Sequence, residues 1–177
     1  MTGDFGSDPG FMGRHLPFLL AAADKYIKPA VRYQGCAYDS GVDFLLPNRY
    51  FTFWSTSDSQ IRSTLETFAS AGEQLEDLAI SKEDLRGYIL SAYAQALPPS
   101  GMLNGRMRFL RRRLFGISTD HINKMITDIR NSSLKDQKTA ARLIHKILQN
   151  SPSAVVGNEK MIDENKDLFD EVMKLQS

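Results

Sequence analysis

The feature that most constrains the fold is a pair of strand-like segments joined by a turn signal. Residues 38–46 alternate in polarity, and residues 50–56 (Tyr-Phe-Thr-Phe-Trp-Ser-Thr) are dense in aromatic and β-branched side chains. Pro47 and Asn48 between them favour a turn. In the first segment Tyr38, Ser40, Val42, Phe44 and Leu46 share one parity, with Asp39, Gly41 and Asp43 on the other. This alternation predicts a β-hairpin.

Most of the remaining chain has the three- and four-residue apolar spacing of helices. The spacing predicts a helix over 11–30 that Pro29 ends, and further helices between Asp58 and Leu148, two of which are expected to begin at Ser81, in a capping box, and at Ser118. The last of the predicted segments are a β-branched strand at 153–157, which we expect to join the hairpin's sheet, and a closing helix over 164–175. The fold class expected is α+β, a small, mainly antiparallel sheet packed against helices.

Composition fits one globular domain and excludes several function classes. The chain has 177 residues, 42% of them hydrophobic, with a formal net charge of +1, so the overall charge indicates neither nucleic acid nor an anionic membrane surface. No apolar run approaches the roughly 20 residues of a membrane span. A single cysteine, Cys36, rules out an internal disulfide and suits a reducing compartment.

The first ten residues differ from the rest in composition. They are rich in glycine and acidic residues and lack the basic start of a signal or transit peptide. We therefore expect residues 1–10 to be a disordered or added start, and residues 11–177 to form a single domain.

The segment Arg32-Tyr33-Gln34-Gly35-Cys36-Ala37-Tyr38-Asp39-Ser40-Gly41 is the main candidate for a binding function. It joins a predicted helix to a predicted strand, so Arg32 and Tyr38 can project into one space at the end of the sheet. An arginine fork and a tyrosine hydroxyl suit a peptide carbonyl or a developing oxyanion. On the residues alone, an alternative stays open in which Arg32 caps the helix and Tyr38 is a half-buried sheet residue.

This segment resembles the Arg-x-x-Gly-Gly-Ala-Tyr-Gly motif in the C-terminal half of M16 (pitrilysin/insulinase-type) zinc metallopeptidases. The six-residue spacing from Arg32 to Tyr38 is most similar to the presequence protease and falcilysin branch of that class. Two later stretches resemble that branch too, namely 97–101 with 111–118 (Arg-Arg-Arg-Leu-Phe-Gly-Ile-Ser) and 153–160, which holds Val-Val-Gly. The resemblance therefore extends from about Met12 to Leu175.

The resemblance implies a fold, a function and a set of partners. It implies a domain similar to LuxS and the mitochondrial processing peptidase, here expected to lack its first strand or strands. The function implied is that of a non-zinc C-terminal domain that encloses peptide substrates and presents Arg32 and Tyr38 to the active site of a separate catalytic domain. Its partners would be the N-terminal catalytic half of the same polypeptide and the peptide, and an exposed sheet edge would allow self-association.

The zinc motif of the family, His-x-x-Glu-His, is absent from this chain. His15, His121 and His145 have no partner at the required spacing, and we expect them to be surface or edge residues. Zinc would be bound by a domain outside this segment, so we expect the segment to contain no catalytic or metal-binding residue and to be inactive alone.

Two departures from the motif bear on the site. Cys36 stands in place of the second glycine, and a cysteine is tolerated there if the φ of this residue stays negative. Asp39 adds a negative charge beside Tyr38, and an aspartate can adopt the left-handed conformation at modest cost. A nucleophilic role for Cys36 is disfavoured because no histidine is nearby in the sequence.

Other functions remain as alternatives. A catalytically inactive scaffold or subunit with the M16 fold is the first. Nucleic-acid binding is the second and the weaker, because no aromatic platform adjoins the basic run of Arg106, Arg108, Arg111, Arg112 and Arg113. The expected location is cytoplasmic for a bacterial protein, and mitochondrial or another organelle interior for a eukaryotic one.

Overall fold

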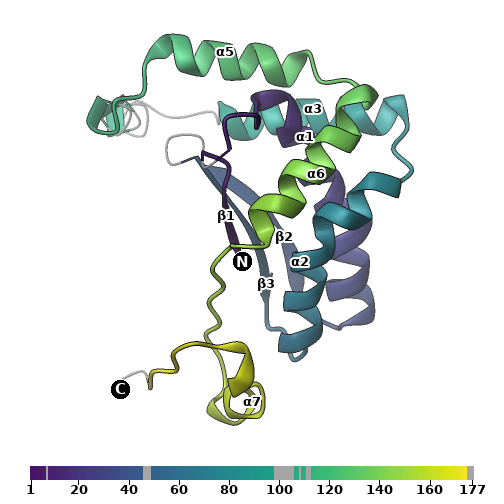
Figure 1. Cartoon of the computed structure of the whole chain (residues 1–177), viewed down its shortest axis with the longest axis vertical. Coiled ribbons are helices and arrows are strands. Elements are labelled where there is room, and N and C mark those ends of the chain that lie inside the picture. Colours follow the sequence, from purple (N-terminus) through teal and green to yellow (C-terminus); the bar gives the residue numbers. More distant parts are fainter. Residues whose placement is uncertain (7, 46–48, 98–105, 108, 111–112, 175–177) are drawn as a thin grey trace.

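The computed structural model describes the chain except residues 7, 46–48, 98–105, 108, 111–112 and 175–177. Its fold is α+β, as the sequence predicts, with helices packed on one face of a small antiparallel sheet (Figure 1). The elements in chain order are β1 (Thr2–Asp4), η1 (Gly13–His15), α1 (Leu16–Ala22), η2 (Ala23–Gln34), β2 (Asp39–Leu45), β3 (Tyr50–Thr56), α2 (Ile61–Asp77), α3 (Lys82–Ala96), α5 (Thr119–Arg130), η4 (Leu134–Asp136), α6 (Gln137–Leu148), α7 (Glu159–Glu164) and η5 (Lys166–Leu168).

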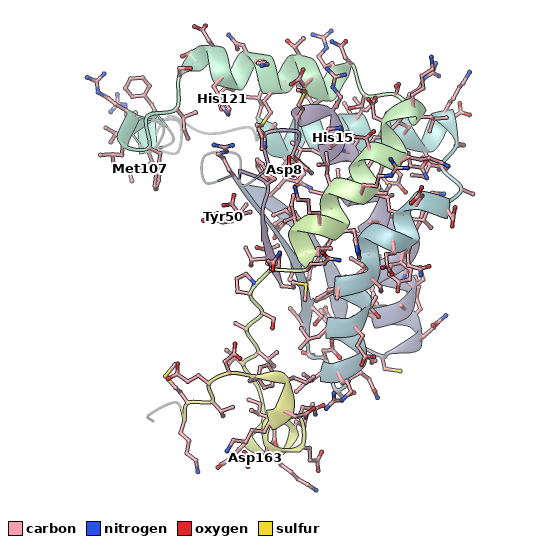
Figure 2. The ribbon with its side chains drawn as sticks, viewed as in Figure 1. Asp8, His15, Tyr50, Met107, His121 and Asp163 are labelled. Atoms are coloured by element: carbon pink, nitrogen blue, oxygen red, sulfur yellow. The ribbon has the colours of Figure 1, made fainter. Side chains whose placement is uncertain are left out.

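The sheet has the strand order β1-β3-β2, with both pairs antiparallel. The predicted hairpin is confirmed as β2 and β3, in a register that places Val42 opposite Phe53. Ser40, Val42 and Phe44 of β2 and Phe51 and Phe53 of β3 are all buried beneath the helices. The opposite face carries partly exposed residues, and Tyr50, at the start of β3, marks its open side in Figure 2.

The first helical segment does not end at Pro29, which corrects the sequence prediction. After α1 the chain continues as a π-helix, η2, with Pro29 inside it and Gln34 as its last residue. The Gly35 N–H donates to the Ala30 carbonyl at 2.8 Å, which is the i to i−5 spacing of this helix type. A widened turn can relieve the clash between a proline ring and the carbonyl four residues earlier, so proline is tolerated here.

Two of the predicted helices begin where expected, and the end of a third is closed by a side chain of a neighbouring helix. Helix α3 begins at a capping box, in which the Ser81 hydroxyl accepts from the Asp84 N–H at 3.0 Å and the Asp84 carboxylate accepts from the Ser81 N–H at 3.0 Å. Helix α5 begins at Ser118, whose hydroxyl accepts from the His121 N–H. The C-terminal end of α2 is closed by Gln137 of α6, whose amide donates to the Leu75 and Leu78 carbonyls at 2.9 and 2.8 Å.

Residues 1–10, expected to be a disordered or added start, contain a short strand. Residues 2–4 form β1, with Gly3 opposite Phe51 of β3. A strand therefore does precede the first helix, which corrects the expectation that this strand is lacking. Thr-Gly-Asp has little intrinsic β propensity, so the pairing with β3 supplies the strand conformation.

The two predictions for the end of the chain are wrong. Residues 153–157 are irregular rather than a strand, and the only bond from this region to the sheet in the described residues is that from the Thr2 N–H to the Pro152 carbonyl at 3.0 Å. The closing helix is replaced by α7 and η5, and the apolar stripe at Leu168 and Phe169 stays only half-buried, without the packing that stabilises short helices.

Candidate functional site

Arg32 and Tyr38 lie on either side of a tight connection between η2 and β2. Arg32 occupies the last turn of η2, and Tyr38 directly precedes β2. Backbone hydrogen bonds hold the connection: the Ala37 N–H donates to the Val31 carbonyl at 3.1 Å, and the Tyr38 N–H donates to the Thr56 carbonyl at 3.0 Å. The chain thus brings both residues to one end of the sheet.

Both side chains are accessible. Tyr38 is 76% exposed, so the alternative in which it is a half-buried sheet residue is wrong. The Arg32 guanidinium lies 3.7 Å from an Asp39 carboxylate oxygen, and each of these side chains is 41% exposed. Arg32 also lies over the Tyr33 ring, with its Cζ 5.7 Å from the ring centroid. An ion pair this exposed contributes about 0–1 kcal/mol, so Arg32 can leave Asp39 for another anionic group.

The backbone of this connection differs from the expectation at two positions. Cys36 has φ +62°, in the left-handed region, whereas the sequence analysis required a negative φ. Gly35 has φ −81° and is needed for a different reason, because a Cβ there would lie 2.7 Å from the Val31 carbonyl oxygen. Asp39 is the first residue of β2 and does not adopt the left-handed conformation. The strained residue is therefore Cys36, where the M16 motif has glycine.

Cys36 has no catalytic surroundings in the part of the chain that the structure describes. Its thiol is exposed, and its one hydrogen-bonding contact is a long one, 3.9 Å from Sγ to the Gln34 carbonyl oxygen. No described histidine or other base is bonded to it, so the arrangement offers nothing that would activate a nucleophile.

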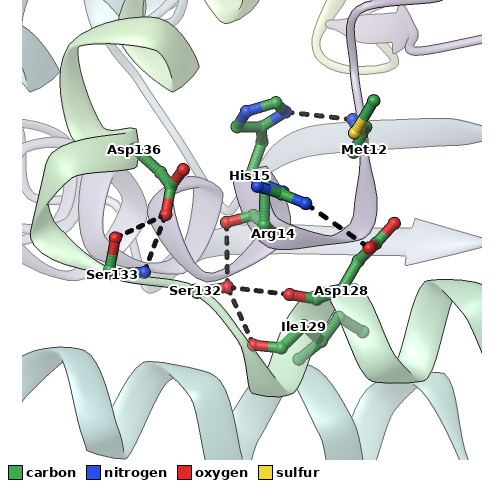
Figure 3. Close-up of polar contacts among 8 residues, drawn as sticks. All are labelled: Met12, Arg14, His15, Asp128, Ile129, Ser132, Ser133 and Asp136. Atoms are coloured by element: carbon green, nitrogen blue, oxygen red, sulfur yellow. Dashed lines mark hydrogen bonds and ion pairs between the residues drawn. The ribbon is translucent and has the colours of Figure 1, made fainter.

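The three histidines lie apart, and one of them is buried. His121 is exposed on α5, and the side chain of His145 on α6 is 32% exposed and lies 3.6 Å from Glu73. His15 is only 3% exposed, which corrects its expected surface position. Figure 3 shows its Nδ1 accepting from the Met12 N–H at 3.0 Å.

The His15 region connects the start of the helical layer to the end of α5. The Ser132 hydroxyl lies 2.9 Å from the Arg14 carbonyl oxygen and 2.8 Å from that of Ile129, and Arg14 forms an ion pair with Asp128 at 3.7 Å (Figure 3). Burial is the main cause that lowers the pKa of His15, and the positive charge of Arg14 lowers this pKa further. The negative charges of Asp136 and Asp128 raise the pKa but do not offset the effect of burial. The site is thus a structural junction with a neutral imidazole.

Two further site classes find no support within the described ranges. No group of three or more histidine, cysteine or acidic side chains there is arranged to hold a metal ion. No described helix combines the length and the apolar character needed to cross a membrane. In the basic run, Arg106 and Arg113 are exposed and have helical backbone, whereas Arg108, Arg111 and Arg112 lie outside the described residues.

Residues 16–158 match the PreP C-terminal domain family. This chain belongs to that family, the C-terminal domain of the presequence proteases within the M16 peptidases. The M16 peptidases are zinc enzymes, and the family match covers most of the chain, including Arg32, Tyr38 and helices α2, α3, α5 and α6. The sequence resemblance to this branch is therefore confirmed at the level of the domain.

A curated relative is similar over nearly the same length. "Protein HypA" from Clostridium perfringens (strain 13 / Type A) is 27% identical over 148 residues, which is 83% of this chain. The chain spans 15% of that protein's length, so the relative contains far more than this domain.

Sequence reasoning missed a cavity of about 380 Å³ beside the unpaired edge of β2. Its lining includes Asp24 and Lys28 of η2, Ser40 and Val42 of β2, and Tyr88 of α3. One signal was present in the sequence: Ser40 is a polar residue at a strand position, and the next two residues of the same parity, Val42 and Phe44, are apolar and buried.

Proposed function

We propose that this chain is the non-zinc C-terminal domain of a zinc metalloendopeptidase that degrades peptides, and that it presents Arg32 and Tyr38 to the active site of the catalytic half. The proposal rests on membership of the PreP C-terminal domain family. One observation carries the assignment of the two residues: both side chains are exposed where η2 meets β2, and Tyr38 has 76% of its surface free.

The chemistry of the pair suits stabilisation of charge on a scissile peptide. During hydrolysis the carbonyl oxygen gains negative charge, which a bound zinc ion in the catalytic half would stabilise in part. The Arg32 guanidinium and the Tyr38 hydroxyl would donate to that oxygen or to an adjacent carbonyl once the two halves close. Because Arg32 gives up only an exposed ion pair with Asp39, the exchange costs little.

The partners follow from the same proposal. They are the N-terminal catalytic half of the same polypeptide, an unfolded peptide substrate, and zinc bound by the catalytic half. Residues of this chain would take no part in holding the metal. The location proposed is the cytoplasm in a bacterium and an organelle interior such as the mitochondrial matrix in a eukaryote.

The test uses two conservative variants in the longer polypeptide that joins this domain to a zinc-binding half. Tyr38→Phe removes only the hydroxyl, and Arg32→Lys keeps the charge but removes the fork. Each should lower peptide turnover about a hundred- to thousandfold, the usual cost of one oxyanion donor, with zinc content and melting temperature unchanged. The double variant should lose less than the sum of the two effects. Near-normal turnover in both single variants would instead assign Arg32 and Tyr38 a structural role.

A catalytically inactive scaffold is the second candidate. The replacement of the motif's second glycine by the strained Cys36 favours it, since it departs from the motif beside the proposed site. The presence or absence of a His-x-x-Glu-His helix in the catalytic half separates the two candidates.

A further inference from the structure

The unpaired edge of β2 faces a groove whose opposite wall is α3. The cavity in this groove has a volume of about 380 Å³, within the range of roughly 300–1,000 Å³ found for ligand pockets. Ser40, Gly41 and Val42 line it from the strand, and Gly87 and Tyr88 line it from the helix. Gly87 leaves this wall open, because a Cβ there would meet nothing within 4 Å.

The register of the sheet determines which backbone groups point into this groove. Phe53 exchanges hydrogen bonds with Met1, its N–H donating to the Met1 carbonyl and its carbonyl accepting from the Met1 amino group, both at 3.0 Å. The Phe53 backbone therefore faces β1, away from β2. Val42 is opposite Phe53, so it sits at a position of the β2–β3 ladder without hydrogen bonds, and its own N–H and carbonyl point to the outer edge.

The same alternation places the Ser40 backbone at the outer edge. The Ser40 N–H donates to the Asp39 carboxylate at 2.9 Å. Only the Ser40 carbonyl therefore remains available to a partner at this edge. No backbone partner from the described residues reaches the Ser40 carbonyl or the Val42 N–H and carbonyl. One free amide and two free carbonyls at strand spacing are complementary to another extended chain.

Two side chains of the groove also have no partner among the described residues. Ser40 is only 4% exposed, and its hydroxyl oxygen is buried without a hydrogen bond. Lys28 forms no ion pair in the described part of the chain. The acidic residue of the groove, Asp24, already accepts from the Tyr88 hydroxyl at 2.7 Å. Asp24 and Lys28 carry opposite charges, and Lys28 is the one of the two whose charged group has no hydrogen-bonding or ion-pair partner among the described residues.

We propose that this groove binds an extended peptide, which adds to β2 as a further strand and carries an acidic side chain toward Lys28. The inference deepens the proposed function, because it gives the domain a peptide-binding groove whose lining does not include Arg32 or Tyr38. Side chains of the peptide that point to the same face as Ser40 and Val42 enter the cavity between η2 and α3. The backbone pairing supplies affinity for any unfolded sequence, and Lys28 supplies the preference for acidic residues.

The first experiment measures fluorescence anisotropy with the full 177-residue chain and a fluorescein-labelled peptide, SVTEVTVS. Two further peptides carry N-methyl groups on one or the other set of alternate residues. Only the amides of the residues that face β2 can donate hydrogen bonds to the strand. The peptide methylated at those residues should therefore bind at least about tenfold more weakly than the parent, as expected for two lost hydrogen bonds. The peptide methylated at the alternate residues should bind like the parent. Equal binding of all three peptides, or no saturable binding up to millimolar concentration, would overturn the proposal.

The second experiment tests the groove with protein variants. Gly87→Phe places a ring in the groove and should weaken binding of the parent peptide about tenfold, whereas Gly87→Ala, the matched control, should leave it unchanged. Lys28→Glu should reverse the preference between SVTEVTVS and the same peptide with lysine in place of glutamate. Lys138→Glu, on the exposed surface of α6, should leave that preference intact. If the lysine peptide binds the wild-type chain as well as SVTEVTVS does, the acidic preference is wrong.

A third measurement separates this site from other occupants and from the proposed function. If the chain forms a concentration-dependent dimer that Gly87→Phe abolishes, the groove receives a second copy and the proposal is wrong. If Tyr38→Phe and Arg32→Lys impair turnover in the longer polypeptide while the groove variants change no peptide affinity, the proposed function stands and the groove assignment fails. The reverse pattern supports the groove and rejects the role of the Arg32–Tyr38 pair.

Discussion

Gly72 of α2 lies directly against the backbone of His145 in α6. A Cβ at Gly72 would stand 2.5 Å from the His145 Cα and closer still to its amide nitrogen. Both neighbours are backbone atoms, so neither can move aside as a flexible side chain would. Helices α2 and α6, which run side by side in Figure 1, approach this closely because the glycine has no side chain.

Gly72→Ala should therefore destabilise the fold, although alanine favours a helix over glycine by about 1 kcal/mol. The two helices must separate to admit a methyl group, and overpacking of this kind costs about 1–3 kcal/mol. We expect the net loss to lie at the upper end of that range, because the clash is with the main chain of α6, which cannot move without shifting the helix. Urea unfolding monitored by circular dichroism measures the difference.

Gly87→Ala is the matched control for this prediction. Gly87 is also inside a helix, but its Cβ direction is open. The same substitution should stabilise α3 by about 0.8–1 kcal/mol, the full propensity difference. A loss of stability at both positions would show that the packing at Gly72 does not decide the effect.

Cys36→Gly should stabilise the domain. Cys36 has φ +62°, and a non-glycine residue in the left-handed region costs about 1–2 kcal/mol, part of which glycine returns through its greater freedom in the unfolded chain. The expected gain in the free energy of unfolding is about 0.5–1 kcal/mol. Cys36→Ala keeps the strain and removes the thiol, so it should match the wild type. If alanine stabilises as much as glycine, the thiol and not the backbone is responsible.

Stability should fall as the pH drops below the ordinary pKa of histidine. Burial lowers the pKa of His15 in the folded state, so between that pKa and about 6.5 the unfolded chain binds the additional proton. The contribution of His15 is complete above about pH 6.5 and is lost as the pH falls from there to the folded pKa. Protonation also removes the Nδ1 acceptor of the Met12 N–H.

His15→Asn supplies the control for this pH dependence. Asparagine offers an acceptor oxygen in place of Nδ1 and does not titrate, so the variant should have lower stability overall but a flatter profile of unfolding free energy from about pH 7 to 5. His121 and His145 remain in both proteins, so the difference between the two profiles belongs to His15. If the unfolding free energy of His15→Asn falls with pH as steeply as that of the wild type, His15 is not the source of this pH dependence.

Asp39→Asn should raise peptide turnover if the proposed function holds. The amide removes the charge that pairs with Arg32 but keeps an oxygen for the Ser40 N–H. An exposed ion pair contributes about 0.2–1 kcal/mol, so its removal should increase peptide turnover by up to about fivefold. The melting temperature should change little. Asp43→Asn removes an equivalent charge from the same exposed side of β2 and should have no effect on turnover. Reduced turnover in Asp39→Asn would indicate that the ion pair positions Arg32.

The isolated chain should bind no stoichiometric zinc. Its described residues contain no cluster of ligands for a metal, and its histidines lie on separate elements. Metal analysis after dialysis against micromolar zinc measures the content directly. One retained zinc per chain would overturn the division of roles between this domain and a zinc-binding half.

The sequence determined the elements whose pattern is local. The alternation around Val42 and the turn signal at Pro47 predict the β2–β3 hairpin, and Ser81 and Ser118 predict helix starts, because pleat parity and side-chain capping act over a few residues. The spacing of Arg32 and Tyr38, together with the stretches 97–101, 111–118 and 153–160, likewise indicated the family from the sequence.

Tertiary structure decided what depends on distant partners. Strand β1 forms where Gly3 pairs with Phe51, whereas residues 153–157 stay irregular although their own composition favours a strand, and only the bond from Thr2 to Pro152 ties the neighbouring chain to the sheet in the described residues. The groove beside β2 depends on where α3 packs and on which edge the Phe53 backbone faces. Local propensity carries no information about such long-range choices, because the free energy that settles them comes from contacts between segments far apart in the chain.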